Sequence, residues 1–208
     1  MIHIFHGFLG STKDFLFLNR DIVKIHDLYS LKHYPEVKED DTLVGYSLGG
    51  RIALNIADSI NFSCKKIVLI NAHPGLQSED QKLLRIDFEN KVMHEMRNKT
   101  KNDFLIWWNN LPIFKYDTPI EVSEEIFRAS IPLFEKYRLS NQKNHLPEMI
   151  KNREKILYIA GLKDQTYMKI SHELFKPGGI RVKEILCGHR AFQHQNELLN
   201  VLLEESVL

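Results

Sequence analysis

Several features that define other protein classes are scarce in this sequence of 208 residues. It has two cysteines, Cys64 and Cys187, which lack the spacing of a metal site, so we interpret them as reduced, partly buried thiols. No apolar run approaches the ~18 residues of a membrane span. The 28 Lys and Arg residues nearly balance the 27 Asp and Glu residues, and the net charge of +1 predicts no general attraction for nucleic acid or a membrane surface.

The amino-terminal residues also lack the features of a secretion signal. The segment MIHIFHGFLGS has no basic start, and His3 and His6 interrupt its apolar residues. The length fits one domain, residues 1–208, that buries a core without disulfides or metals. We therefore expect a cytoplasmic enzyme, whose oligomeric state the sequence leaves open.

Short apolar or β-branched runs, typical of strands, alternate with amphipathic stretches of helix length. These runs are Ile2–Phe5, Val23–Leu28, Thr42–Val44, Lys66–Ile70, Ile156–Ile159 and Val182–Leu186. Near-continuous apolar runs suit strands covered by helices on both faces. The alternation with helices indicates a parallel sheet. The sequence thus predicts an α/β fold with about six mostly parallel strands.

One long segment, residues 79–152, carries helical patterns and no convincing strand. The patterns cover Asp80–Arg97, Lys101–Asn110, Val122–Arg138 and Pro147–Asn152, with boundaries or kinks expected at Pro112, Pro119, Pro132 and Pro147. An insertion between two strands of an α/β sheet is expected over the carboxyl ends of the strands, where ligands bind. We therefore predict that this segment is a helical cap or lid.

The segment GYSLG, residues 45–49, places Ser47 between a strand and a helix. This G-x-S-x-G pattern holds a serine on a sharp, strained turn, with small residues that let strand and helix approach closely. The following helix N-terminus aims free N–H groups and its positive dipole end at the serine. Ser47 is therefore the candidate nucleophile or base.

Two later loops supply partners for Ser47. Asp164 follows the strand-like run that ends at Ile159, and His189 follows the run that ends at Leu186. The chain order Ser, Asp, His is that of the α/β-hydrolase fold. A serine at neutral pH needs such a histidine partner to react. We predict a catalytic triad of Ser47, Asp164 and His189.

The segment HGFLG, residues 6–10, follows the first strand and resembles the oxyanion loop of that fold. We expect the backbone N–H groups of Phe8 and Leu48 to form an oxyanion hole, which stabilises negative charge on a carbonyl-derived oxygen. The side chain of His6 is expected to brace the loop.

The segments GYSLGGR and HPGLQ, residues 45–51 and 73–77, resemble the MenH family of 2-succinyl-6-hydroxy-2,4-cyclohexadiene-1-carboxylate synthases of menaquinone biosynthesis. The resemblance covers roughly Ile4 to His189. It implies a lyase that uses its triad as a base and needs no metal or organic cofactor. It also implies a small polycarboxylate substrate, bound by Tyr46, Arg51, Arg85, Trp108 and Arg128. Arginine suits planar carboxylates, because it donates two parallel hydrogen bonds.

The sequence also departs from that family. It starts almost at the strand of the oxyanion loop, so the first two strands of the usual fold are expected to be absent. Arg190 stands beside the predicted catalytic histidine and is expected to change the charge of the pocket. Two other functions stay open: a small carboxylesterase or thioesterase that uses the same triad for acyl transfer, and a non-catalytic binding protein of the same fold.

Overall fold

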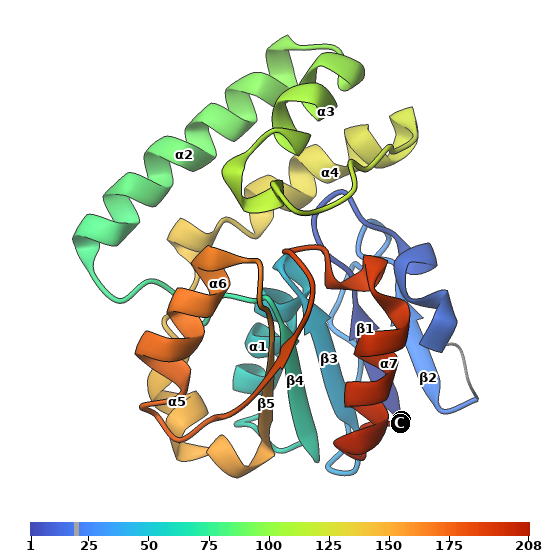
Figure 1. Ribbon diagram of the computed structural model, residues 1–208, viewed down its shortest axis with the longest axis vertical. Helices are drawn as coiled ribbons and strands as arrows, with labels where there is room; N and C mark the ends of the chain where they lie inside the picture. The colour runs from blue at the N-terminus through green and yellow to red at the C-terminus, as the bar shows by residue number, and fades with distance from the viewer. Residues whose placement is uncertain (19–20) are drawn as a thin grey trace.

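A sheet of six parallel strands forms the centre of the protein in the computed structural model, which describes residues 1–18 and 21–208 (Figure 1). The strands are β1 (Ile2–Phe5), β2 (Val23–His26), β3 (Thr42–Tyr46), β4 (Lys66–Ile70), β5 (Ile156–Gly161) and β6 (Arg181–Ile185). Their order is β2-β1-β3-β4-β5-β6, and each neighbouring pair is parallel. The predicted strand number and fold class are confirmed.

Helices cover both faces of this sheet. One face carries α1 (Leu48–Ser59), α5 (Leu146–Lys151), α6 (Gln165–Ile170) and the π-helical turn η5 (Ser171–Phe175). The other carries the 3₁₀ helices η1 (Thr12–Leu18) and η6 (Ala191–Gln193), with α7 (Gln195–Glu204). Along β5, Ile156, Tyr158 and Ala160 enter the first core, whereas Leu157 and Ile159 enter the second. This alternation follows from the two-residue period of a strand.

Three helices lie beyond the carboxyl ends of the strands: α2 (Glu79–Asn98), α3 (Lys101–Asn109) and α4 (Glu124–Lys136) (Figure 1). We call residues 79–136 the cap; it also contains the 3₁₀ helix η2 (Pro112–Phe114). Its core, which includes Met93, Phe104 and Phe134, also takes in Leu9 of the oxyanion loop. The cap thus packs onto the edge of the sheet where the predicted site residues lie.

The later part of the 79–152 segment packs differently. After η3 (Leu139–Asn141), α5 returns to the side of the sheet, where Met149 is buried in the same core as β5. The 3₁₀ helix η4 (Arg153–Lys155) then leads into β5. The helices that cover the carboxyl ends of the strands therefore finish at Lys136.

Polar residues explain where the cap helices begin. The side chains of Ser78, Thr100 and Ser123 accept hydrogen bonds from backbone N–H groups in the first turns of α2, α3 and α4. Such caps satisfy N–H groups that have no partner inside a helix. Pro132, expected at a boundary or kink, lies inside α4, which continues to Lys136.

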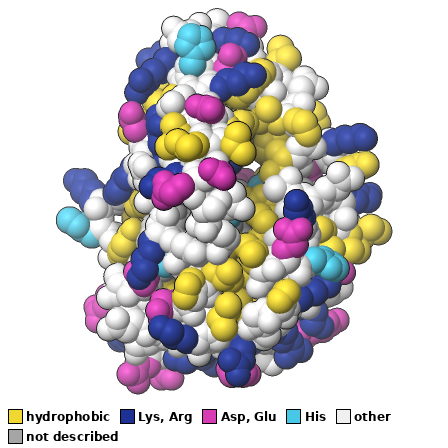
Figure 2. Space-filling model, turned by 90° about the vertical axis from the view of Figure 1, so that its left-hand side faces the viewer, with side chains coloured by type: hydrophobic (Ala, Val, Ile, Leu, Met, Phe, Trp, Pro, Cys, Tyr) yellow, Lys and Arg dark blue, Asp and Glu magenta, His cyan; other side chains and the backbone are white. Residues whose placement is uncertain are grey.

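The face of the molecule in Figure 2 carries charged side chains of both signs. Lys and Arg side chains are interspersed with Asp and Glu over the face in Figure 2. Hydrophobic side chains gather on this face in a band between the cap and the sheet domain. Among the described residues, no helix combines the length and apolar character needed to cross a bilayer.

Acid is expected to destabilise the fold through His26. Its ring stacks on Phe5, and its Nε2 lies 2.9 Å from Nδ1 of His3. Burial, with the neighbouring His3 and Lys24, lowers the pKa of His26 to about 4. An unfolded histidine has a pKa near ~6.5, so the unfolded chain binds more protons between that pH and about 4, and stability falls as the pH falls through this window.

The variant His26→Gln checks this expectation. A glutamine retains a polar partner for His3 and removes the titration, so urea unfolding should show a smaller loss of stability between pH 7 and pH 4 than in the original chain. An equal loss in both proteins would show that other groups carry the acid sensitivity.

Candidate active site

Ser47 occupies the strained turn that the G-x-S-x-G pattern predicts. Its backbone has φ 52° and ψ −112°, in the left-handed half of conformational space that side chains avoid. Its N–H donates to the carbonyl of Ile70 at 2.9 Å, which fixes the turn against β4. A Cβ at Gly49 would lie 2.1 Å from the carbonyl oxygen of Phe5, so only glycine lets α1 pack this close to β1.

The three predicted triad residues meet at the carboxyl ends of the strands. Nδ1 of His189 lies 2.6 Å from Oδ2 of Asp164, and Nε2 lies 3.0 Å from Oγ of Ser47. Asp164 is 1 % exposed and His189 is 4 % exposed. In the tautomer that fits both contacts, Nδ1–H donates to Asp164, and Nε2 accepts the Ser47 hydroxyl proton. This geometry allows His189 to withdraw that proton.

Asp164 is held by the start of the helix that follows it. It is the N-cap of α6, and its Oδ1 accepts from the N–H of Tyr167 at 3.1 Å. Oδ2 is thereby left for His189. The ring of Tyr167 packs 4.9 Å from that of His189, centroid to centroid, and so helps to fix the plane of the imidazole.

The predicted oxyanion loop lies beside Ser47. Phe8 lines the cavity next to Ser47, and no backbone hydrogen bond is found from the N–H of Phe8 or of Leu48 within the described residues. His6 braces the loop: its Nδ1–H donates to the carbonyl of Gly7 at 2.9 Å, and its Nε2 accepts from the N–H of Leu28 at 3.2 Å. Burial lowers the pKa of His6, which suits this neutral role.

Asn71 connects the two loops that carry the acid and the histidine. Its Oδ1 accepts from the N–H of Gly161 at 2.9 Å, and its Nδ2 donates to the carbonyls of His189 at 2.8 Å and Gly188 at 3.2 Å. The residue is fully buried and has φ 43°, a value that asparagine tolerates better than most residues. We did not single out Asn71 from the sequence; its position directly after β4 was the available signal.

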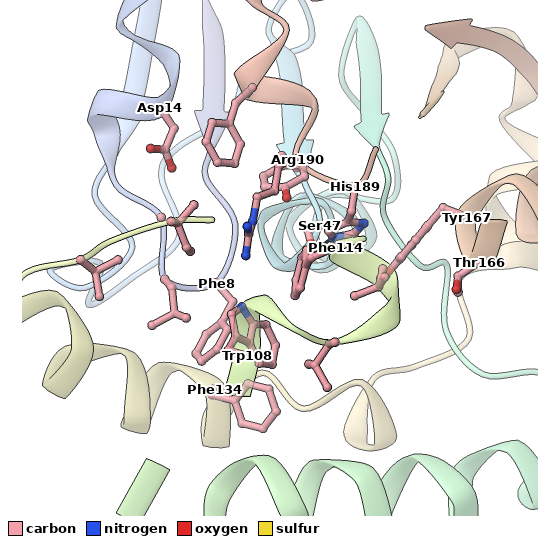
Figure 3. A pocket seen from close by; sticks show the side chains of 18 of the residues that line it. Phe8, Asp14, Ser47, Trp108, Phe114, Phe134, Thr166, Tyr167, His189 and Arg190 are labelled. Carbon is pink, nitrogen blue, oxygen red and sulfur yellow. Dashed lines mark hydrogen bonds between the residues drawn. The ribbon is translucent and has the colours of Figure 1, made fainter. Parts of the chain in front are cut away.

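A cavity of about 420 Å³ opens in front of Ser47, beneath the cap (Figure 3). Aromatic side chains form much of its wall: Phe8, Tyr46, Phe88, Trp108, Phe114, Phe134, Tyr167 and Phe192. Trp108 and Tyr46 thus lie where we predicted. The size and mostly apolar lining are those of a small-molecule site.

Two of the three predicted arginines line this cavity. Arg51 is buried, and its Nη1 donates to the carbonyl of Tyr137 at 2.5 Å. Burial and the nearby Arg85 lower the pKa of Arg51 to about 10, so it keeps its charge at neutral pH. Arg85 also reaches the cavity, while its Nε donates to Glu89 at 2.8 Å.

Arg128 does not line the cavity, and the prediction for this residue is wrong. Its side chain is 76 % exposed and pairs with Glu124 one turn earlier on α4. The buried face of α4 is formed by Phe127, Ser130, Leu133 and Phe134, which turns Arg128 towards solvent.

Arg190 supplies a third guanidinium to the cavity instead. It is 2 % exposed, and its Nη1 and Nη2 donate to the carbonyl of Thr118 and to Oδ1 of Asn109, both at 2.7 Å. The cap also contacts the histidine loop through Asp117, whose carboxylate accepts from the backbone N–H groups of His189 and Arg190, each at 3.1 Å. The expectation that Arg190 alters the charge of the pocket therefore has a structural basis.

One acid that we did not predict also lines the cavity. Asp14 accepts from the N–H of Ser11 at 3.0 Å, and burial raises the pKa of Asp14 to about 6. It lies on η1, near the oxyanion loop (Figure 3). Its carboxylate therefore gains a proton more readily than an exposed one.

The HPGL segment builds a turn. Its Gly75 has φ 115°, and a Cβ there would lie 2.4 Å from the carbonyl oxygen of Lys143. Nδ1 of His73 accepts from the N–H of Gly75 at 3.1 Å. Burial and the charges of Arg85 and Arg51 lower the pKa of His73 to about 3, so it stays neutral. The segment thus serves to place the start of the cap.

Comparisons with known proteins agree with this architecture. No protein-family profile matches the chain. A 2-succinyl-6-hydroxy-2,4-cyclohexadiene-1-carboxylate synthase of Klebsiella pneumoniae is 25 % identical over 104 residues, which are 50 % of this chain and 38 % of that protein. The match thus spans well under two thirds of the relative. The structure of MenH from S. aureus superposes with a TM-score of 0.76 at 20 % identity and covers 99 % of this chain and 94 % of its own.

The chain has the α/β-hydrolase fold and resembles MenH. A carboxylesterase of Nitrososphaera gargenis also superposes, with a TM-score of 0.73 at 11 % identity over 99 % of this chain and 89 % of its own. The fold is therefore shared by MenH and by esterases. The choice between their reactions depends on the site.

Proposed function

We propose that the protein is an α/β-hydrolase-fold lyase that eliminates pyruvate from 2-succinyl-5-enolpyruvyl-6-hydroxy-3-cyclohexene-1-carboxylate. The observation that carries this proposal is the combination of a complete triad with buried guanidinium groups in one cavity. Ester hydrolysis needs only the triad and an oxyanion hole. Buried arginines beside them suit a substrate that carries several carboxylates.

The triad geometry supports proton removal by Ser47. His189 accepts the hydroxyl proton through Nε2, and Asp164 stabilises the imidazolium that results. The serine oxygen then removes the ring proton next to the succinyl carbonyl. The negative charge moves onto that carbonyl oxygen, where the N–H groups of Phe8 and Leu48 would stabilise it.

Collapse of this enolate completes the reaction. The electron pair of the broken C–H bond shifts through the ring double bond and expels the enolpyruvyl oxygen, so one C–O bond breaks. The released enolate of pyruvate then takes up a proton and becomes pyruvate. Each of these steps uses only protein groups.

The cavity supports selection of an anionic ligand. Arg51 is buried beside Ser47 on the first turn of α1, and it has no carboxylate within 4.0 Å among the residues that the structure describes. A buried charge without an acidic partner is unfavourable unless a ligand supplies one. A substrate carboxylate would fill that role.

Loss of Arg51 should therefore weaken substrate use. We expect Arg51→Gln to lower kcat/KM by ~10- to 100-fold, because one charge-assisted hydrogen-bonding partner of the substrate is removed. The matched control Arg128→Gln removes an exposed arginine and should stay within ~2-fold of the original chain. Steady-state kinetics of pyruvate release measures both; equal effects of the two substitutions would contradict the assignment.

The proposed activity is tested by adding the enolpyruvyl substrate and following pyruvate through coupled reduction by lactate dehydrogenase. We expect saturable pyruvate release at rates far above the uncatalysed reaction. Pyruvate release that does not exceed the uncatalysed rate would reject the proposal.

A carboxylesterase or thioesterase is the second candidate, supported by the same triad and by the aromatic walls of the cavity. It predicts a burst of p-nitrophenol from a p-nitrophenyl ester, with acylation of Ser47, and no pyruvate release. A non-catalytic binding protein predicts neither product. The filled triad and its hydrogen-bonded geometry argue against that third function.

A further inference from the structure

Contacts with the cap hold the side chain of Arg190 in a fixed position at the cavity wall. Its guanidinium lies over the ring of Phe114, with Cζ 4.1 Å from the ring centroid. The hydrogen bonds to Thr118 and Asn109 hold both terminal nitrogens. Figure 3 shows this guanidinium projecting into the pocket beside Ser47, towards Phe8 and Trp108.

These contacts leave much of its hydrogen-bonding capacity unused. A guanidinium has five N–H donors, and the two hydrogen bonds to Thr118 and Asn109 occupy two of them. Within residues 1–18 and 21–208, no carboxylate oxygen lies within 4.0 Å of the guanidinium nitrogens; Asp117 binds only the backbone N–H of Arg190. Burial lowers the pKa of Arg190, as expected for a cation removed from water, and the more distant charge of Asp117 offsets only part of this effect. An anionic ligand in the cavity would supply the absent partner.

Arg190 and Arg51 are anchored at different places. Arg190 donates to Thr118, which precedes α4, whereas Arg51 donates to Tyr137, which follows it. The 13 residues of α4 span ~20 Å at ~1.5 Å per residue. The cavity thus holds two separate cationic positions.

We propose that Arg190 is a substrate-binding residue that binds one carboxylate of the ligand, while Arg51 binds another, so that the cavity prefers ligands with two or more carboxylates to monoanions. Arg190 thus has the carboxylate-binding role that was expected of Arg128. This inference deepens the proposed function and rests on it for the identity of the polycarboxylate ligand.

Arg190 also joins the cap to the histidine loop. Its test must therefore separate ligand binding from stabilisation of this contact. Gln193 offers the matched control, because it braces the same junction. Its Oε1 accepts from the N–H of Thr118 at 2.9 Å, and its Nε2 donates to the carbonyl of Thr118 at 2.8 Å. Unlike Arg190, it does not line the cavity.

The probe is 2-succinylbenzoate, a stable aromatic compound with the same two carboxylates as the proposed product. It is compared with 4-oxo-4-phenylbutanoate, which lacks the ring carboxylate, and with 2-butanoylbenzoate, which lacks the chain carboxylate. Calorimetry measures binding of all three to the original chain, to Arg190→Gln and to Gln193→Ala. No turnover is needed, so this test and the pyruvate assay fail independently.

We expect the original chain to bind the dianion at least ~10-fold more tightly than either monoanion. Arg190→Gln should weaken the binding of the dianion and of one monoanion by ~10- to 100-fold, and it should leave the binding of the other monoanion unchanged. Gln193→Ala should keep the preference of the original chain for the dianion. The proposal is overturned if the original chain binds no dianion or shows no preference for it. It is also overturned if Arg190→Gln retains the preference, or if Gln193→Ala loses it equally.

Discussion

Ser47→Ala should lower kcat for pyruvate release by at least ~10³-fold. The hydroxyl oxygen is the atom that removes the ring proton in the proposed reaction, and no other side chain is hydrogen-bonded to Nε2 of His189 among the described residues. General base catalysis alone is worth ~10²- to 10⁴-fold, and members of a triad act as one unit. Coupled pyruvate detection gives the rate.

The control is Ser59→Ala, at the exposed far end of α1, where the hydroxyl donates only to the carbonyl of Ile56. This variant should retain full activity. The thermal midpoint of Ser47→Ala should stay close to that of the original chain, because alanine needs no more space on the strained turn. Full pyruvate release by Ser47→Ala would remove the serine from the mechanism.

Asp164→Asn should reduce kcat by ~10³- to 10⁴-fold while the fold stays intact. An asparagine Oδ1 still accepts from the N–H of Tyr167, so the cap of α6 is kept. At the other position, an Nδ2 group would donate to Nδ1 of His189. The imidazole would then carry its proton on Nε2, where it cannot accept the proton of Ser47.

Circular dichroism and the thermal midpoint establish whether Asp164→Asn is folded. The prediction requires a folded protein that has lost its turnover but still binds 2-succinylbenzoate. If the variant retained most of its kcat, the orientation of His189 by this carboxylate would not matter to the reaction.

The sequence predicted those parts of the molecule whose signals are local. Buried parallel strands are near-continuous apolar runs, so Lys66–Ile70 could be located to the residue. Ser47, Asp164 and His189 each follow a strand. Because the strands are parallel, the three loops lie at the same edge of the sheet, at the carboxyl ends of the strands.

Arg128 was misplaced although a local signal was available. Phe127, Ser130, Ile131 and Phe134 follow the three- and four-residue spacing of a buried helix face, and Arg128 lies off that face. The resemblance to MenH pointed to Arg128, whereas the periodicity of α4 places this residue on the exposed face. The helix period was the better guide.

Asn71 and Arg190 could not be interpreted in the same way. The partners of Asn71 lie 90 to 118 residues away, and those of Arg190 lie 72 to 81 residues away. Their functions depend on how the cap and the loops pack in three dimensions. No spacing along the chain encodes that arrangement.

The central claim is that this site performs elimination. The most direct measurement follows pyruvate and the conjugated cyclohexadiene product together, starting from purified 2-succinyl-5-enolpyruvyl-6-hydroxy-3-cyclohexene-1-carboxylate. The account predicts that the two products form at equal, saturable rates that fall by at least ~10³-fold in Ser47→Ala. Hydrolysis of p-nitrophenyl esters without release of pyruvate from this compound would contradict it.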